Sequence, residues 1–245
     1  MLLLSGVRLV ILCLLTATAA FSQDLSRQIR QTGGQVFTNA NGTIKEINLN
    51  GHPGVTVDLL NKIGRLPELT DLSLEKTPVT DTGLAALSSL PKLEWLNLYR
   101  TEITDLGAQH LAKIKSLTDL PIGSTKITDA GLKHLGQLHL LEYLGLRANA
   151  VTDQALTNLH SLTNLTALHL GETRVTDKGL TEVGKLKSLE RLWLHDTKVS
   201  DNGLDRLANL KNLKQLLIYN SGVTAAGYRK LRKSLPDCFI LYRVE

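Results

Sequence analysis

The chain has 245 residues, of which 42% are hydrophobic, 21% charged and 4% aromatic, with a formal net charge of +5. The hydrophobic fraction is ample for a core, which excludes a chain too polar to fold. The two cysteines are Cys13, in an apolar N-terminal run, and Cys238. Loss of that run would leave Cys238 alone and exclude an internal disulfide.

Residues 1–22 match a secretory signal peptide. Arg8 is their one charge, Leu9 to Leu15 is apolar, and small residues follow, so cleavage is expected after Ala19 or Ser22. An uncleaved anchor is the alternative, although the apolar run is short for a span of about 20 residues. We therefore expect an exported protein, in the periplasm, on the cell surface or in the medium, with no stable membrane span after cleavage.

Residues 23–43 are predicted to form an N-terminal cap. Asp24 to Gln31 reads as a short covering helix, and Asn41-Gly42 lies between strand-like runs, which is a strong hairpin signal. A divergent first coil follows from Ile44.

From Leu69 onward the same 24-residue pattern occurs seven times. Its first leucines are Leu69, Leu93, Leu117, Leu141, Leu165, Leu189 and Leu213. Within a repeat, leucines at positions 4 and 6 alternate with polar residues, which predicts a short half-buried strand. Apolar residues at positions 16, 19 and 22 predict the inner stripe of a short helix. Each repeat is thus a strand, a turn and a helix, and stacked repeats share one core.

Three polar columns accompany the leucines. Aspartate at position 13, for example Asp105, is expected to cap the helix N-terminus rather than to bind calcium, because the alternating acidic loop of calcium sites is absent. Ala225 replaces this aspartate in the last repeat and predicts a frayed final helix. Threonine at position 9 is expected to bond to backbone groups of adjacent coils. Glycine at position 15 predicts close backbone approach between coils.

The segment Thr101-Glu102-Ile103-Thr104-Asp105-Leu106-Gly107 resembles the cysteine-containing, F-box-associated subclass of leucine-rich repeats. The 24-residue form with threonine in place of cysteine is similar to secreted bacterial leucine-rich repeat proteins. The resemblance covers 44–235. It implies an α/β solenoid, a right-handed β-α superhelix with a parallel sheet on the concave face and short helices on the convex face, that binds proteins. The chain has no F-box-like segment, so a role in ubiquitin ligation is not implied.

The C-terminal end is predicted to be a second cap. Tyr228 to Leu235 extends the last helix, and 236–245 supplies a capping strand in which Cys238 is buried rather than reactive. The segment from Asp205 onward contains eight basic and three acidic residues, so the excess positive charge lies at this end.

Side chains at positions 3, 5 and 7 point away from the leucine core, to the concave face. Both tryptophans and three of the five tyrosines occupy these positions. Exposed aromatic and arginine side chains are typical anchors of protein interfaces. The predicted partner-binding residues are Trp95, Tyr99, Arg100, Tyr143, Arg147, His169, Arg191, Trp193, His195 and Tyr219.

We therefore expect a monomeric, non-enzymatic module that binds a protein or peptide, with a glycan as the alternative ligand, and no nucleic acid. The alternative is an envelope-associated module that binds an acidic polymer or a membrane surface through Arg229, Lys230, Arg232 and Lys233. No catalytic motif is present, and no catalytic residue, metal or cofactor is predicted. His169 and His195 could share a metal ion with Glu172 or Asp196, but two histidines without a fixed third ligand are weak evidence.

Overall fold

The computed structural model describes residues 20–243. The signal peptide predicted over 1–22 lies outside this part of the chain except for its last three residues. The division of the chain into leader, caps and solenoid therefore stays a prediction.

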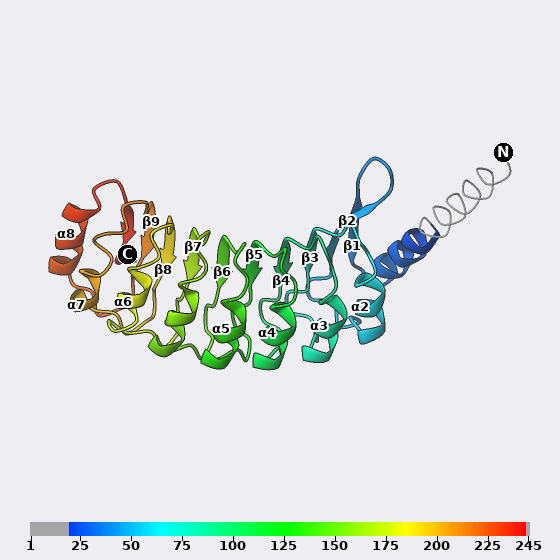
Figure 1. The fold of residues 1–245 in the computed structure, drawn as a ribbon, viewed down its shortest axis with the longest axis horizontal. Helices are drawn as coiled ribbons and strands as arrows, with labels where there is room; N and C mark the ends of the chain where they lie inside the picture. The colour runs from blue at the N-terminus through cyan, green and yellow to red at the C-terminus, as the bar shows by residue number, and fades with distance from the viewer. Residues whose placement is uncertain (1–19, 244–245) are drawn as a thin grey trace.

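The described chain forms a stack of coils around one ten-stranded sheet, in which the strands follow each other in chain order (Figure 1). The first two strands pair antiparallel, and every other neighbouring pair is parallel. The strands are β1 (Gln35–Thr38), β2 (Ile44–Asn48), β3 (Asp71–Ser73), β4 (Trp95–Asn97), β5 (Asp119–Pro121), β6 (Tyr143–Gly145), β7 (Ala167–His169), β8 (Arg191–Trp193), β9 (Gln215–Leu217) and β10 (Phe239–Leu241).

Short helices cover the side of the stack opposite the sheet. After a helix over 20–31, they are α2 (Val57–Ile63), α3 (Asp81–Leu87), α4 (Asp105–Leu111), α5 (Asp129–Leu135), the 3₁₀ helix η1 (Asp153–Leu159), α6 (Leu180–Val183), α7 (Asp201–Leu204) and α8 (Ala225–Ser234). Strands pack about 4.8 Å apart whereas helices need about 10 Å, so the sheet lies on the inner side of the curve. The predicted parallel sheet and alternating helices are confirmed.

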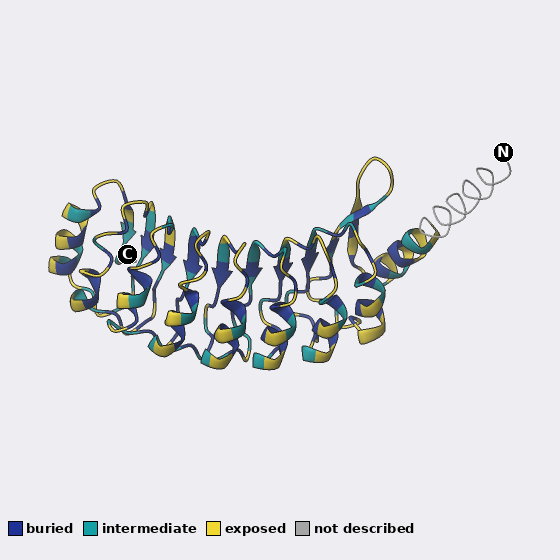
Figure 2. Ribbon diagram, in the orientation of Figure 1, coloured by how far each residue is buried: buried dark blue, intermediate teal, exposed yellow. Residues whose placement is uncertain are grey.

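The core is the continuous layer between sheet and helices (Figure 2). Leucines at positions 4 and 6, such as Leu96 and Leu98, are fully buried, as are helix residues such as Leu84 and Leu87. The third residue of the helical stripe, such as Leu90, is buried in the turn after the helix.

In each repeat, the residue shortly after the strand, at position 8, has a left-handed backbone conformation. Position 8 has a φ of 50 to 58° in all seven repeats, although none of these residues is glycine: Lys76, Arg100, Ser124, Ala148, Glu172, Asp196 and Asn220. Such a conformation persists only where the surrounding structure holds it. Here the backbone N–H of position 8 donates to a carbonyl of the next coil, for example Glu172 N to His195 O at 2.9 Å.

The aspartate column has a different role from the predicted one. The helix N-caps are the residues before it, such as Thr128, whose hydroxyl accepts from Ala130 N. Asp105 instead joins two coils: its Oδ1 accepts from Thr128 N at 2.7 Å and its Oδ2 accepts from the Thr128 hydroxyl at 2.6 Å. The same pair of bonds, here called the inter-coil clasp, also occurs at Asp81, Asp129, Asp153, Asp177 and Asp201.

The prediction that Ala225 frays the last helix is wrong. Helix α8 begins at Ala225 and spans ten residues, and the Thr224 hydroxyl caps it by accepting from Ala226 N and Gly227 N. An aspartate at this position would clasp a following coil, and no further 24-residue repeat follows it in 226–243. Its absence therefore leaves the helix intact.

The prediction that the threonine column bonds to backbone groups of adjacent coils is also wrong. Each hydroxyl bonds within its own coil, as when Thr101 donates to Leu98 O at 2.7 Å. Asn149 is the member that does bridge coils: its Nδ2 donates to Ile122 O at 3.0 Å and its Oδ1 accepts from Thr125 N at 2.9 Å. The longer amide side chain reaches backbone groups of the neighbouring coil, whereas the hydroxyls of this column bond to backbone only within their own coil.

Strands also lie at both ends of the described stack. β1 and β2 form a hairpin around the Asn41-Gly42 turn, where Gly42 has a φ of 77°. At the other end β10 adds a parallel strand to β9 and buries Cys238. Burial raises the pKa of the Cys238 thiol to about 11, which agrees with the prediction that it is not reactive.

Candidate functional site: the concave sheet face

The parallel register places equivalent positions of successive repeats side by side across the sheet. Trp95 is paired with Asp71 on one neighbouring strand and with Asp119 on the other. His169 is paired with Trp193. Both tryptophans are only half-buried, so they lie on the sheet surface and not in the leucine core.

Five of the predicted site residues are in mutual contact. We call Tyr143, His169, Trp193, His195 and Tyr219 the aromatic cluster. The His169 and Trp193 rings stack with centroids 5.3 Å apart, and the His195 and Tyr219 rings stack at 4.8 Å. Edge-to-face contacts, Tyr143 to Trp193 at 6.3 Å and His169 to His195 at 5.2 Å, join the pairs into one row across β6 to β9.

His195 is not an exposed contact residue, contrary to the prediction. Only 4% of its surface is exposed, because its ring lies over Gly171 on the preceding coil. A Cβ on Gly171 would lie 2.5 Å from His195 Nε2, so a larger residue there would displace the ring. His195 therefore supports Tyr219 and His169 from below instead of offering its own surface to a partner.

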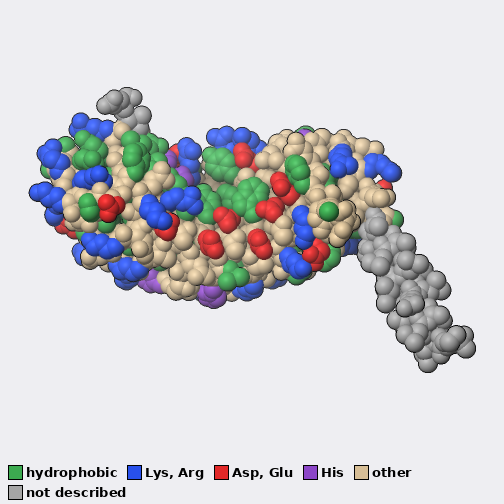
Figure 3. All heavy atoms as spheres, turned by 90° about the horizontal axis from the view of Figure 1, so that it is seen from above, with side chains coloured by type: hydrophobic (Ala, Val, Ile, Leu, Met, Phe, Trp, Pro, Cys, Tyr) green, Lys and Arg blue, Asp and Glu red, His purple; other side chains and the backbone are tan. Residues whose placement is uncertain are grey.

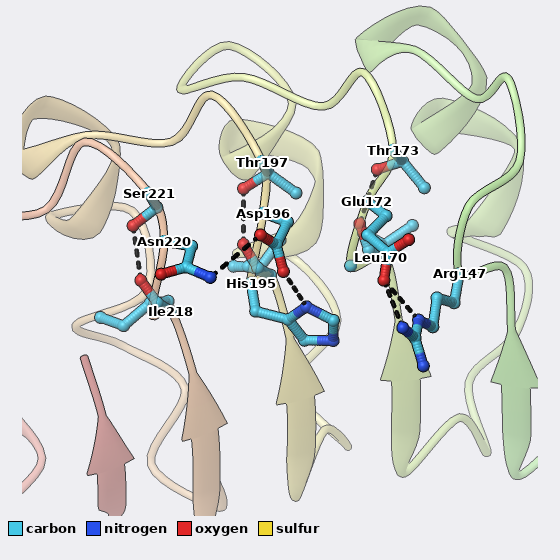
Figure 4. Close-up of polar contacts among 12 residues, drawn as sticks. Arg147, Leu170, Glu172, Thr173, His195, Asp196, Thr197, Ile218, Asn220 and Ser221 are labelled. Carbon is cyan, nitrogen blue, oxygen red and sulfur yellow. Dashed lines mark hydrogen bonds and ion pairs between the residues drawn. The ribbon is translucent and has the colours of Figure 1, made fainter. Parts of the chain in front are cut away.

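The arginines border the aromatic rings. The Arg191 guanidinium lies 5.8 Å from the Trp193 ring centroid, and that of Arg100 lies 5.3 Å from the Tyr99 ring centroid. Arg147 forms an ion pair with Glu172, with Nη2 and Oε1 2.5 Å apart (Figure 4). This contact with Glu172 raises the pKa of Arg147, so the guanidinium stays charged while it is bound to the carboxylate.

A hollow of about 250 Å³ lies in the middle of the concave face, between Trp95 and the aromatic cluster. Its lining residues are Glu75, Asn97, Tyr99, Pro121, Gly123, Tyr143, Gly145, Arg147 and His169. The floor is low because Gly123 and Gly145 have no side chains to fill it. Tyr99 and Tyr143 form its walls, and Glu75 and Arg147 place opposite charges at its rim.

Burial changes the protonation of two groups around this hollow. The pKa of His169 is lowered to about 4, because burial penalises its charged form and the neighbouring His195 and Arg147 oppose a second positive charge. Burial likewise raises the pKa of the Tyr143 hydroxyl. Both side chains are therefore neutral near pH 7 and act as uncharged aromatic surfaces.

Charges of both signs lie along the face. Asp71, Glu75 and Asp119 lie toward the N-terminal half together with Arg100, and Arg147 and Arg191 lie toward the C-terminal half together with Glu172 and Asp196. Figure 3 looks onto the sheet side of the molecule, where hydrophobic side chains gather in the middle with acidic groups beside them and more Lys and Arg toward the C-terminal end.

The basic residues of α8 are partly engaged in the protein's own structure. Lys230 pairs with Asp205, with Nζ and Oδ2 2.6 Å apart, and Arg232 donates to the carbonyl of Cys238. All four of the basic residues Arg229, Lys230, Arg232 and Lys233 are nevertheless exposed. Two of the four charges also have partners within the chain, and the alternative of an electrostatic binding surface at this end stays a prediction.

Several residues around the site were not predicted from sequence. Pro121, Gly123 and Gly145 shape the hollow, and Asn97 and Glu75 complete its wall. Their positions in the repeat are the concave ones, so the pattern placed them on this face. Nothing in the pattern shows that small residues on neighbouring strands produce a depression.

Comparison with known proteins supports the fold. A family model described as "Leucine Rich repeat" matches residues 161–184. The structure is similar to that of internalin C2 from Listeria monocytogenes, with 27% identity and a TM-score of 0.66, over 83% of this chain and 82% of that one. It is also similar to another Listeria monocytogenes internalin, inlF, with 22% identity and a TM-score of 0.67, over 85% of this chain and 65% of that one.

A third similar structure comes from a plant. It is the leucine-rich repeat ectodomain of the membrane receptor kinase GASSHO1/SCHENGEN3 from Arabidopsis thaliana, in complex with CASPARIAN STRIP INTEGRITY FACTOR 2. Its identity is 20% and its TM-score 0.57, over 84% of this chain and 25% of that one. No protein in the curated set matches the chain.

The chain therefore has a leucine-rich repeat solenoid fold and is similar to bacterial proteins of that fold. Export and the cysteine-containing subclass stay predictions. In residues 20–243, no helix combines the length and the apolar character needed to cross a membrane.

Proposed function

We propose that the protein is a non-enzymatic recognition module that binds a protein or peptide through its concave sheet face. The observation that carries the proposal is the aromatic cluster, in which the rings hold each other in fixed orientations on an open surface. Rigid aromatic side chains lose little conformational entropy on binding, which is why they dominate interface energetics. The residues of the aromatic cluster lie on the face of the sheet opposite the leucines, so packing of the core does not require aromatic side chains at these positions.

The shape and charge of the face support a macromolecular partner. The central hollow has room for one side chain of the partner, and the half-buried Trp95 and Trp193 are further anchors on the same face, outside its lining. Asp71 and Asp119 beside Trp95, and Arg191 beside Trp193, favour a partner with complementary charges next to its anchoring groups. The similar Arabidopsis ectodomain is itself in complex with CASPARIAN STRIP INTEGRITY FACTOR 2, which is consistent with a macromolecular partner.

We further propose that the protein acts as an exported monomer and does not bind nucleic acid. The leader-like residues 1–22 support export. The excess positive charge lies at the C-terminal cap rather than on the concave face, which does not match the basic stripe of nucleic-acid-binding surfaces.

The test is affinity capture from native extracts, with binding of each captured protein then measured against purified variants. Trp193→Ala and Trp95→Ala should each weaken the interaction at least tenfold, and moderate salt should not release the partner. Leu106→Ala removes an exposed leucine from α4, on the helical side, and is the matched control that should bind normally.

Retained binding by the double tryptophan variant would refute the concave site. Release in moderate salt, together with loss of binding after charge reversal at Arg229 and Lys233, would favour the electrostatic alternative instead. A captured glycan in place of a protein would correct the ligand class but not the surface.

A further inference from the structure

Three potential metal ligands converge at one edge of the concave face. Glu172 and Asp196 occupy the same position in neighbouring coils, and His195 directly precedes Asp196. One donor atom from each of the three residues lies within 4.8 Å of the other two. His169, which the sequence suggested as a ligand, does not belong to this group.

The three side chains are held by the fold before any ion binds. Glu172 and Asp196 both have left-handed backbones, with φ of 58° and 57°, and their N–H groups are bonded to carbonyls of the next coil. Asn220 Nδ2 donates to Asp196 Oδ1 at 3.1 Å (Figure 4). The buried ring of His195 is fixed between Tyr219 and His169. Preorganised ligands of this kind reduce the cost of binding an ion.

Lone pairs remain available in the cluster. Arg147 bonds to Oε1 of Glu172 through both Nε, at 2.6 Å, and Nη2, and no described residue hydrogen-bonds to Oε2. Nδ1 of His195 and Oδ2 of Asp196 are 2.8 Å apart and share a hydrogen bond. This bond lowers the pKa of Asp196, which keeps its carboxylate charged. An ion bound by both atoms would take the place of the proton between them.

We propose that Glu172, His195 and Asp196 form a site for a divalent transition-metal ion, with Zn²⁺ as the best match. One imidazole and two carboxylates suit Zn²⁺, which binds nitrogen and oxygen at about 2.0–2.2 Å. His195 Nδ1 and Asp196 Oδ2 already lie close together, so Glu172 is the ligand that has to move toward them to meet those distances. The sequence alone predicts no metal, because it shows no fixed third ligand; the structure supplies Glu172 and Asp196 together.

Three protein ligands leave one position of a tetrahedral ion open. A water molecule or a donor atom of a partner would complete the coordination at that position. The site does not depend on the proposed function, since the ion binds to residues of this chain alone. If both hold, the metal ion would add a contact to the partner.

The test is calorimetric titration of the metal-stripped, untagged full chain with ZnCl₂, together with the visible spectrum of the Co²⁺ form. We expect one ion per chain with a micromolar dissociation constant. Asp196→Asn and Glu172→Gln keep the shape of each side chain and should each weaken binding at least tenfold, and His195→Ala should abolish it. Circular dichroism of each variant establishes that it is folded.

The matched control is His160→Ala. His160 Nε2 lies 2.7 Å from Glu182 Oε2, so it forms another histidine–carboxylate pair, and no third potential ligand among residues 20–243 joins these two in a metal-binding group. Zn²⁺ binding unchanged in His160→Ala supports the site. Absence of saturable binding, or equal binding by Asp196→Asn, Glu172→Gln and the unaltered protein, would overturn the proposal. Partner binding by the metal-stripped protein is measured separately, so failure of one proposal does not affect the other.

Discussion

Gly131 lies directly against the carboxylate of Asp105 from the preceding coil: a Cβ on Gly131 would be 2.5 Å from Asp105 Oδ1. The glycine column therefore makes room for the inter-coil clasp, whereas the sequence suggested close approach of backbone. Gly107, Gly179, Gly203 and Gly227 have the same relation to the aspartates before them.

We expect Gly131→Ala to lower the free energy of unfolding by about 1–3 kcal/mol, because the new methyl group either displaces the carboxylate or strains the coil. Asp105→Ala should cost about 1–3 kcal/mol by leaving Thr128 without its acceptors. Since the methyl group damages the same bonds, the double variant should be less destabilised than the sum. Urea unfolding of the four proteins measures this coupling.

The matched control for this cycle is Gly54→Ala. A Cβ there would meet only Thr32, at 3.8 Å, and the backbone of Gly54 does not have a positive φ. Its effect should stay within about 0.5 kcal/mol. Fully additive losses from Gly131→Ala and Asp105→Ala would show that the glycine does not serve the clasp.

The protonation of His169 should make stability depend on pH. Its pKa falls from the ordinary 6.5 to about 4 on folding, so between these pH values the unfolded chain binds more protons. Stability is therefore lost as the pH falls from about 6.5 to about 4. Relative to His169→Gln, the unaltered protein should become less stable over this window, as measured by urea unfolding at several pH values.

Titration of the carboxylates contributes equally to the stability curves of the two proteins. The difference between the two curves therefore reports the protonation of the His169 imidazole. An NMR titration of the histidine rings provides a direct check. Protonation of His169 near pH 6.5, or parallel stability curves for the two proteins, would contradict the buried environment described for this ring.

Cys238 should resist thiol reagents while the protein is folded. The side chain is 1% exposed and burial raises its pKa to about 11, so the reactive thiolate is scarce at pH 8. A Cys13→Ser chain leaves Cys238 as the single thiol. Its modification by a disulfide reagent should be at least a hundredfold slower than in concentrated urea. Rapid labelling under native conditions would mean that the C-terminal cap opens readily.

The sequence predicted the architecture well because a leucine at position 4 or 6 of a stacked coil can be buried only in the core between sheet and helices. The same alternation correctly placed Trp95 and Trp193 outside the leucine core. Apolar residues three apart fit α and 3₁₀ helices equally, so the 3₁₀ geometry of η1 could not be distinguished from sequence.

Contacts between coils were the part that sequence could not supply. Periodicity gives the position of Asp105 within its own coil, where it looks like a helix cap, but not its distance to Thr128. His195 has the alternation of an exposed residue, and is buried because Gly171 on the neighbouring coil leaves space for its ring. Both outcomes depend on residues 23 or 24 positions away.

The inter-coil clasp has a direction, since each aspartate supplies acceptors and the following coil supplies the donors. A unit of 24 residues duplicated inside the array would find a compatible neighbour on both sides. The same unit added after the last repeat would find the Ala225 methyl group at the position where the other repeats supply an aspartate carboxylate. The array can therefore change its length by internal duplication with the clasp kept, whereas a unit added beyond its last repeat would gain the clasp only after an alanine-to-aspartate change.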